Sequence, residues 1–159
     1  MSPRIDTASV QIRAPAAQVF RAFADPQAMA AWLPPEGIAG RMRIFDFVDG
    51  GGYRMRLTYP AAAQGAGKTS ADADEVEVRF VRIVPDARIE EVVRFESDDP
   101  AYAGEMRITW LLTPEEGAGT RVTVRCEDVP AGIAAADHVA ALQSTLAQLA
   151  AFVERCEGA

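Results

Sequence analysis

The sequence predicts an α+β domain in which a curved antiparallel sheet of six to seven strands wraps a long C-terminal helix. Apolar residues alternate with polar ones almost without a break over residues 40–128, which is typical of a sheet with one buried face. Over residues 131–156 they recur instead every three or four positions, which indicates an amphipathic helix. Because one helix cannot fill the concave side of a strongly twisted sheet, we also expect a mostly apolar cavity between them.

The N-terminal part of the chain predicts one strand and two short helices. Residues 5–13 alternate as a strand, and Pro15 suits the first turn of a helix. Asp25-Pro26 begins a second short helix, which ends at Pro34-Pro35. The two short helices therefore follow the first strand directly.

The middle of the chain predicts six further strands, with a strong hairpin signal at Asp49-Gly50-Gly51. Residues 60–73 are small and polar, which predicts a loop that could act as a lid. Within it, residues 62–69 fit a relaxed phosphate-loop pattern, but a strand follows instead of the helix that such a loop requires, so nucleotide binding is not expected. The predicted strands are 40–48, 52–59, 74–84, 88–97, 104–113 and 119–127.

Length and charge restrict the class of protein. The 159 residues suit a single domain over residues 1–159. With 23 acidic and 16 basic residues the net charge is −7, which disfavours nucleic acid and anionic membranes as partners. The basic residues also look separate, spread singly along strands as at Arg41, Arg43, Arg54 and Arg56.

The sequence also carries expectations about location and assembly. Neither a signal-peptide run nor an apolar stretch of about 18 residues is found, so we expect a cytoplasmic protein. An antiparallel edge strand could support a homodimer. Cys126 and Cys156 suffice for neither a disulfide framework nor a zinc site, and His138 is the one histidine. We therefore expect no metal and no cofactor.

Candidate ligand-binding residues follow from the expected inward face of the sheet. In the strand 88–97, Glu91 shares its face with Ile89 and Val93, so its carboxylate should face the cavity as an acid, a base or a ligand anchor. The alternatives are a pairing with an inward base or a place at the rim. His138 could lie at the mouth of the cavity or be an exposed helix residue. The remaining candidates are apolar or aromatic: Trp32, Tyr53, Met55, Phe80, Phe95, Met106, Trp110 and Leu142.

Several segments carry a resemblance to a known superfamily. They are APAAQVFRAFADPQAMAAWLPP at residues 14–35, FDFVDGGGYRMRL at 45–57, the segment 67–114, and TRVTVRCEDVPAGI at 120–133. The chain resembles the START-like (SRPBCC) helix-grip superfamily, and within it bacterial proteins similar to activators of heat-shock chaperone ATPase and to polyketide cyclases. The resemblance implies a domain that binds a small hydrophobic molecule, aromatic or lipid-like, in its cavity.

The resemblance leaves two other functions open. One is a polyketide cyclase or dehydratase-like enzyme, which would use an acid or base on a poly-keto chain. The other is a protein that acts like a chaperone ATPase activator. The sequence has no nucleophile flanked by a base and its orienting partner, so it does not decide whether the protein is an enzyme. The identity of the ligand is likewise open, because members of one superfamily act on very different molecules.

Overall fold

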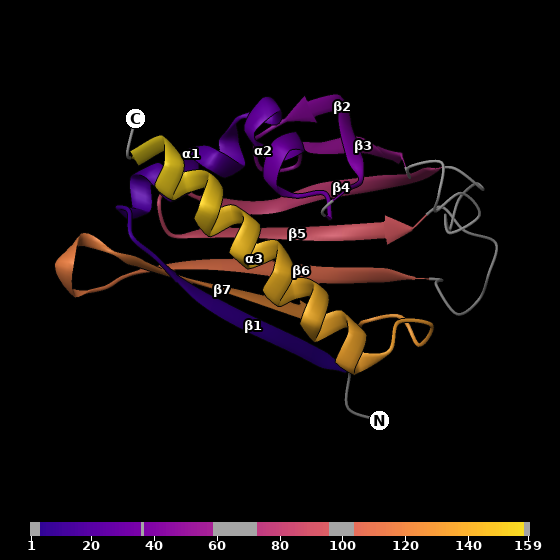
Figure 1. Ribbon diagram of the computed structural model, residues 1–159. Coiled ribbons are helices and arrows are strands. Elements are labelled where there is room, and N and C mark those ends of the chain that lie inside the picture. Colours follow the sequence, from indigo (N-terminus) through magenta and orange to yellow (C-terminus); the bar gives the residue numbers. More distant parts are fainter. Residues whose placement is uncertain (1–3, 36, 59–72, 96–103, 158–159) are drawn as a thin grey trace.

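The computed structural model describes residues 4–35, 37–58, 73–95 and 104–157, which form a seven-stranded antiparallel sheet with three α-helices on one face (Figure 1). The predicted fold class is confirmed. The spatial order is β1-β7-β6-β5-β4-β3-β2, so β1 and β2 lie at opposite edges. The strands are β1 Ile5–Ile12, β2 Ala39–Asp46, β3 Gly52–Thr58, β4 Ala73–Val84, β5 Arg88–Phe95, β6 Glu105–Pro114 and β7 Thr120–Glu127.

The two short helices lie where the sequence predicts them, as α1 (Ala16–Ala24) and α2 (Pro26–Trp32). Asp25 separates them and caps α2, because its carboxylate accepts the backbone N–H of Gln27 at 2.9 Å. The indole Nε1 of Trp32 donates to the carbonyl oxygen of Ala22 at 2.9 Å, which fixes α2 against α1. On the sheet, α2 contacts β2 and α1 contacts β6.

The hairpin between β2 and β3 depends on glycine at two positions. Gly50 has φ of 82°, a left-handed conformation that favours glycine. At Gly52, a Cβ atom would overlap the carbonyl oxygen of Val78, so a side chain there would keep β3 from its place beside β4. The predicted hairpin is therefore confirmed. A three-residue 3₁₀ turn at Glu116–Ala118 joins β6 to β7, and the predicted loop 60–73 lies outside the described residues except for its last residue.

The long helix α3 (Ala135–Glu157) crosses the concave face diagonally, from the start of β1 to α1 (Figure 1). It begins four residues later than predicted, because the chain after Pro130 first makes a turn in which the N–H of Ile133 bonds to the Pro130 carbonyl. Its predicted apolar stripe is confirmed, but burial is uneven. Leu146, Leu149 and Val153 are fully buried, whereas Leu142 in the N-terminal half is only partly buried.

A polar contact fixes the C-terminal half of α3. The side-chain amide of Gln148 donates to the carbonyl oxygens of Trp32 and Pro34, both at 2.7 Å. The N-terminal half of the helix has less apolar burial and is connected to β1 instead. In the described part of the chain, no helix is long and apolar enough to span a membrane.

Candidate functional site

A row of side chains crosses the middle of the concave face, one from each of five neighbouring strands. Successive register partners on β1, β7, β6, β5 and β4 place these residues side by side: Asp6, Cys126, Ile108, Glu91 and Phe80. Paired residues in an antiparallel sheet point to the same face. The predicted inward orientation of Glu91 is therefore confirmed, and its side chain is only 2% exposed.

Only one of the two carboxyl oxygens of Glu91 accepts a hydrogen bond from a described residue. Oε1 accepts a hydrogen bond from the indole Nε1 of Trp110 at 2.8 Å. Oε2 is buried and has no hydrogen-bond partner among the described residues. Burial raises the pKa of Glu91 to about 7, although the Trp110 hydrogen bond opposes the shift. The carboxyl group can therefore gain or lose a proton near neutral pH.

Two other titratable groups near Glu91, the Tyr53 hydroxyl and the Cys126 thiol, stay protonated near neutral pH. Burial, together with the charge of Glu91, raises the pKa of Tyr53 well above its usual value. Burial and the charges of Asp6 and Glu91 raise the pKa of Cys126 to about 12. Cys126 faces the core, and its thiol is unreactive by this chemistry. Proton exchange at this site near neutral pH therefore involves Glu91.

Ile108 differs from its neighbours in burial. It lies on the interior strand β6, on the face that α3 crosses, between Cys126 and Glu91 in the register. Those two neighbours are buried, yet Ile108 is only partly buried. Leu142, on the less buried half of α3, belongs to the same apolar cluster and is also partly buried. A partly exposed apolar side chain thus lies in the middle of the sheet, next to Glu91.

Six of the apolar candidates lie in one continuous core. Trp32 and Trp110 meet edge to face at 5.9 Å between ring centroids, and Tyr53 lies 5.7 Å from Phe80. The structure thus brings the predicted residues together, but it does not test whether they contact a ligand. The side chain of Phe95 lies outside the described residues. The six are Trp32, Tyr53, Met55, Phe80, Met106 and Trp110.

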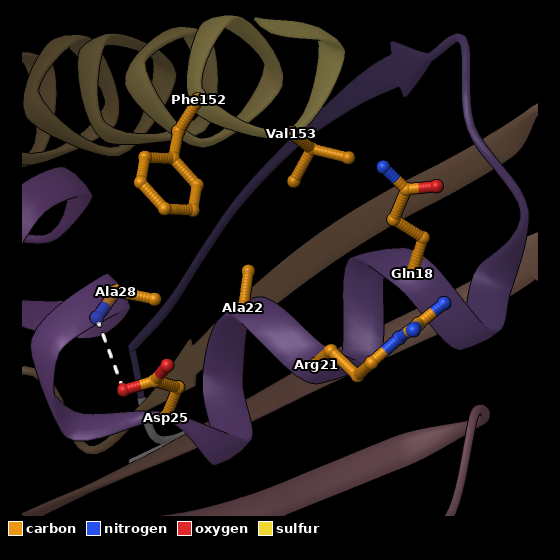
Figure 2. Close-up of a pocket in the computed structure, with 7 residues that line it drawn as sticks. All are labelled: Gln18, Arg21, Ala22, Asp25, Ala28, Phe152 and Val153. Carbon is orange, nitrogen blue, oxygen red and sulfur yellow. Dashed lines mark hydrogen bonds between the residues drawn. The ribbon is translucent and has the colours of Figure 1, made fainter. Parts of the chain in front are cut away.

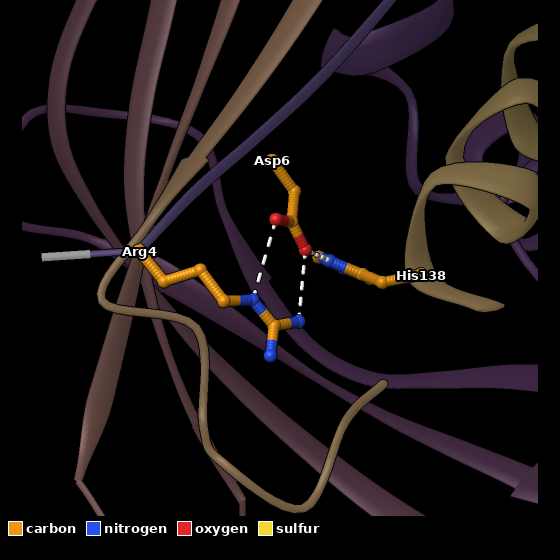
Figure 3. Close-up of polar contacts among 3 residues, drawn as sticks. All are labelled: Arg4, Asp6 and His138. Carbon is orange, nitrogen blue, oxygen red and sulfur yellow. Dashed lines mark hydrogen bonds and ion pairs between the residues drawn. The ribbon is translucent and has the colours of Figure 1, made fainter. Parts of the chain in front are cut away.

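His138 makes a contact that the sequence did not indicate (Figure 3). Its Nδ1 lies 2.7 Å from Oδ2 of Asp6, and the same oxygen accepts a hydrogen bond from Nη2 of Arg4 at 2.9 Å. The hydrogen bond from Arg4 lowers the pKa of Asp6. The side chain of His138 is only 12% exposed, so the alternative that it is an exposed helix residue is wrong. It holds the start of α3 against β1, and its contact with a ligand stays a prediction.

Sequence reasoning missed Asp6 and Arg4. Asp6 shares strand parity with Ala8 and Ile12, so an acid on the inward side of the first strand was a signal that could have found it. Asp6 also ends the row that contains Glu91, three strands away. At the edge of the concave face, the carboxylate of Asp6 is paired with Arg4 and His138. Further in, the carboxyl group of Glu91 has no basic partner among the described residues.

A hollow lies outside the predicted site (Figure 2). It has a cavity volume of about 390 Å³ and lies between α1, the start of α2 and the C-terminal half of α3, into which Phe152 and Val153 point. None of the predicted ligand-binding residues lines it. In the part of the chain that the structure describes, no group of three or more side chains is arranged to hold a metal ion. The lining residues are Gln18, Arg21, Ala22, Asp25, Ala28, Phe152 and Val153.

Residues 13–154 match the family described as "Activator of Hsp90 ATPase homolog 1-like protein". The chain belongs to this family, which is START-like. The chain is 32% identical to protein CV1439 from Chromobacterium violaceum, with a TM-score of 0.78 over 94% of this chain and 97% of that one. The comparison with curated proteins gives no match.

More distant solved structures share the fold. A protein from Arthrobacter aurescens is 17% identical, with a TM-score of 0.78 over 95% of this chain and 86% of that one. DynU16, described as a putative protein in the dynemicin biosynthetic locus, is 20% identical, with a TM-score of 0.67. That match covers 94% of this chain but 47% of DynU16. These two likenesses show the helix-grip architecture and nothing further about activity.

Proposed function

We propose that this protein binds a small, mainly apolar molecule on the concave face and that Glu91 anchors it. The observation that carries the proposal is Oε2 of Glu91, which is buried with no hydrogen-bond partner among the described residues and lies beside the partly buried Ile108. A buried polar atom with no hydrogen bond costs free energy, so a ligand that supplies the missing donor gains affinity from it. Family membership supports a ligand-binding domain in general terms.

The surroundings of Glu91 indicate the chemistry of the ligand. Trp110, Phe80 and Tyr53 supply a large aromatic surface, which favours an apolar and flat molecule. A ligand carboxylate would bring a second negative charge next to Glu91 in a site shielded from water. An uncharged donor such as a phenol or alcohol hydroxyl has no such penalty. We therefore infer a hydroxylated apolar ligand and not an acid.

The position of the ligand follows from the uneven packing. Ile108 on β6 and Leu142 in the N-terminal half of α3 are both partly buried members of the cluster. A molecule between them would reach Glu91 on the neighbouring strand and would lie under the half of α3 that His138 connects to Asp6. Ligand binding would then complete the burial of Ile108 and Leu142.

Filling the space with a larger side chain tests its existence. If the space beside Ile108 is unfilled, Ile108→Phe should change the free energy of unfolding by less than about 1 kcal/mol and should abolish ligand binding. The matched control is Val124→Phe, on the same face of the neighbouring strand but fully buried, where overpacking should cost about 1–3 kcal/mol. Equal destabilisation by both substitutions would show that the space around Ile108 is already filled, and the proposal would fail.

Three matched probes test the ligand chemistry: para-propylphenol, para-propylbenzoate and propylbenzene. Thermal shift and calorimetry at about pH 8, where Glu91 is ionised, should show the phenol binding at least about tenfold more tightly than the benzoate. Glu91→Gln should remove most of that preference. Glu90→Gln is the matched control, because Glu90 lies on the opposite face near Arg88 and Arg107. Equal binding of all three probes would refute Glu91 as the anchor.

The enzymatic alternative is supported by one observation, the pKa of Glu91 near neutrality. Such a group is suited to act as a general base or acid at physiological pH. With a poly-keto substrate mimic, Glu91→Gln should then abolish turnover while binding persists. A change in affinity alone would favour the binding function. The chaperone alternative is supported by the family description alone.

A further inference from the structure

Four arginines that look separate in the sequence come together on the outer face of β2 and β3, away from the helices. Arg41 and Arg56 are direct register partners, and Arg54 lies two residues from Arg56 on the same face of β3. Arg43 joins them, since its Nη1 lies 3.2 Å from the same oxygen of Glu75 that Arg56 contacts at 3.0 Å. The expectation that these basic residues do not cluster is therefore wrong, and antiparallel pairing is the reason.

Positive charge exceeds negative charge in this cluster. Glu75 contacts three of the guanidinium groups, from Arg43, Arg54 and Arg56. Glu77, the register partner of Arg54, adds one more acid. Within the described ranges of the chain, Arg41 has no acidic side chain within ion-pair distance. Among the side chains that the structure describes, two acids thus face four arginines, on a protein whose net charge is −7.

The arginines line a groove. Its volume is about 450 Å³, and its walls are formed by Arg41, Met42, Arg43 and Arg56. Planar guanidinium groups bind phosphate oxygens through paired hydrogen bonds, and they do so better than ammonium groups. Glu75 holds Arg43 and Arg56 through a single oxygen, so part of this surface is already ordered before an anion arrives.

We propose that this groove binds the phosphate group of a small phosphorylated molecule. Arg41 would supply a guanidinium that has no acidic partner among the described residues, and Arg43 and Arg56 would flank the anion from both strands. The groove lies on the opposite face of the sheet from Glu91, so this site would be independent of the apolar ligand site. The residual positive charge of the cluster suits a ligand with two negative charges.

The test uses pyrophosphate as the probe, with citrate as a non-phosphate anion of comparable charge, both at constant ionic strength. Calorimetry with the full chain should show that pyrophosphate binds and that citrate binds at least about tenfold more weakly. Arg41→Gln should weaken pyrophosphate binding at least about tenfold. The loss of Arg41 breaks no ion pair within the described residues, so the variant should keep the wild-type melting temperature.

The matched control is Arg121→Gln on β7. Arg121 is also an exposed outer-face arginine, but its partners are Glu115 and Ser9, far along the sheet from the groove. Pyrophosphate affinity should be unchanged in this variant. Three results would each overturn the proposal: no binding of pyrophosphate at millimolar concentration, equal binding of citrate, or equal losses in the two variants. Charge attraction without a phosphate site explains the second and third results.

Discussion

Glu91→Gln should make the protein more stable at alkaline pH. In the folded protein Glu91 has a pKa of about 7, raised by burial from 4.5. Between these two values the unfolded chain loses the proton while the folded protein keeps it, so stability falls as the pH rises through this window and levels off above it. The shift corresponds to about 3 kcal/mol of unfolding free energy. Glutamine keeps an acceptor for Trp110 but does not ionise, so the variant avoids this loss.

Urea unfolding, followed by tryptophan fluorescence at a series of pH values, measures the effect. The variant and wild type should differ little at about pH 4, and the difference should grow by about 3 kcal/mol in favour of the variant by about pH 8. Other titrating groups are present in both proteins and cancel from the difference. Glu90→Gln, on the outer face, should show no such growth. A difference between Glu91→Gln and wild type that stays constant over this range would refute the buried, uncompensated carboxyl group.

Three further predictions concern the helix contacts and the core. His138→Ala should lower the free energy of unfolding by about 1 kcal/mol near neutral pH, because the contact with Asp6 is lost. Urea unfolding should show that this difference disappears at acid pH, where Asp6 becomes protonated. Gln148→Ala should cost about 1–3 kcal/mol, because two carbonyl groups at the end of α2 lose their donor, whereas the exposed Gln143→Ala should change stability by less than about 0.5 kcal/mol. Cys126 should resist alkylation in the native protein and react after unfolding, which peptide mass spectrometry can follow; labelling of native Cys126 would contradict its burial.

The sequence predicted most of the fold because the fold depends on local signals. Where the strand ends lie in described residues, period-two alternation located them to within about two residues, and Pro15 and Asp25 marked the starts of the short helices. The start of α3 was placed too early, because the apolar pattern extends into the turn after Pro130. The same apolar spacing can occur in a loop turn and in the start of a helix, and only the backbone hydrogen bonds distinguish the two structures.

The candidate site was only partly predictable. Strand parity places Glu91 on the inner face, but parity does not show that one oxygen bonds to Trp110 while the other has no described partner. The contact between His138 and Asp6 joins residues 132 positions apart, and it depends on where α3 crosses the sheet. The arginine cluster was missed for a related reason, since strand pairing and not chain distance brings its members together.

A crystal structure of the protein grown with para-propylphenol tests the central claim most directly. The account predicts ligand density between Ile108 and Leu142, with the hydroxyl within hydrogen-bond distance of Glu91 Oε2. Two results would contradict the account: ligand density only in the hollow beside Phe152, or no ligand on the concave face at saturating probe concentration.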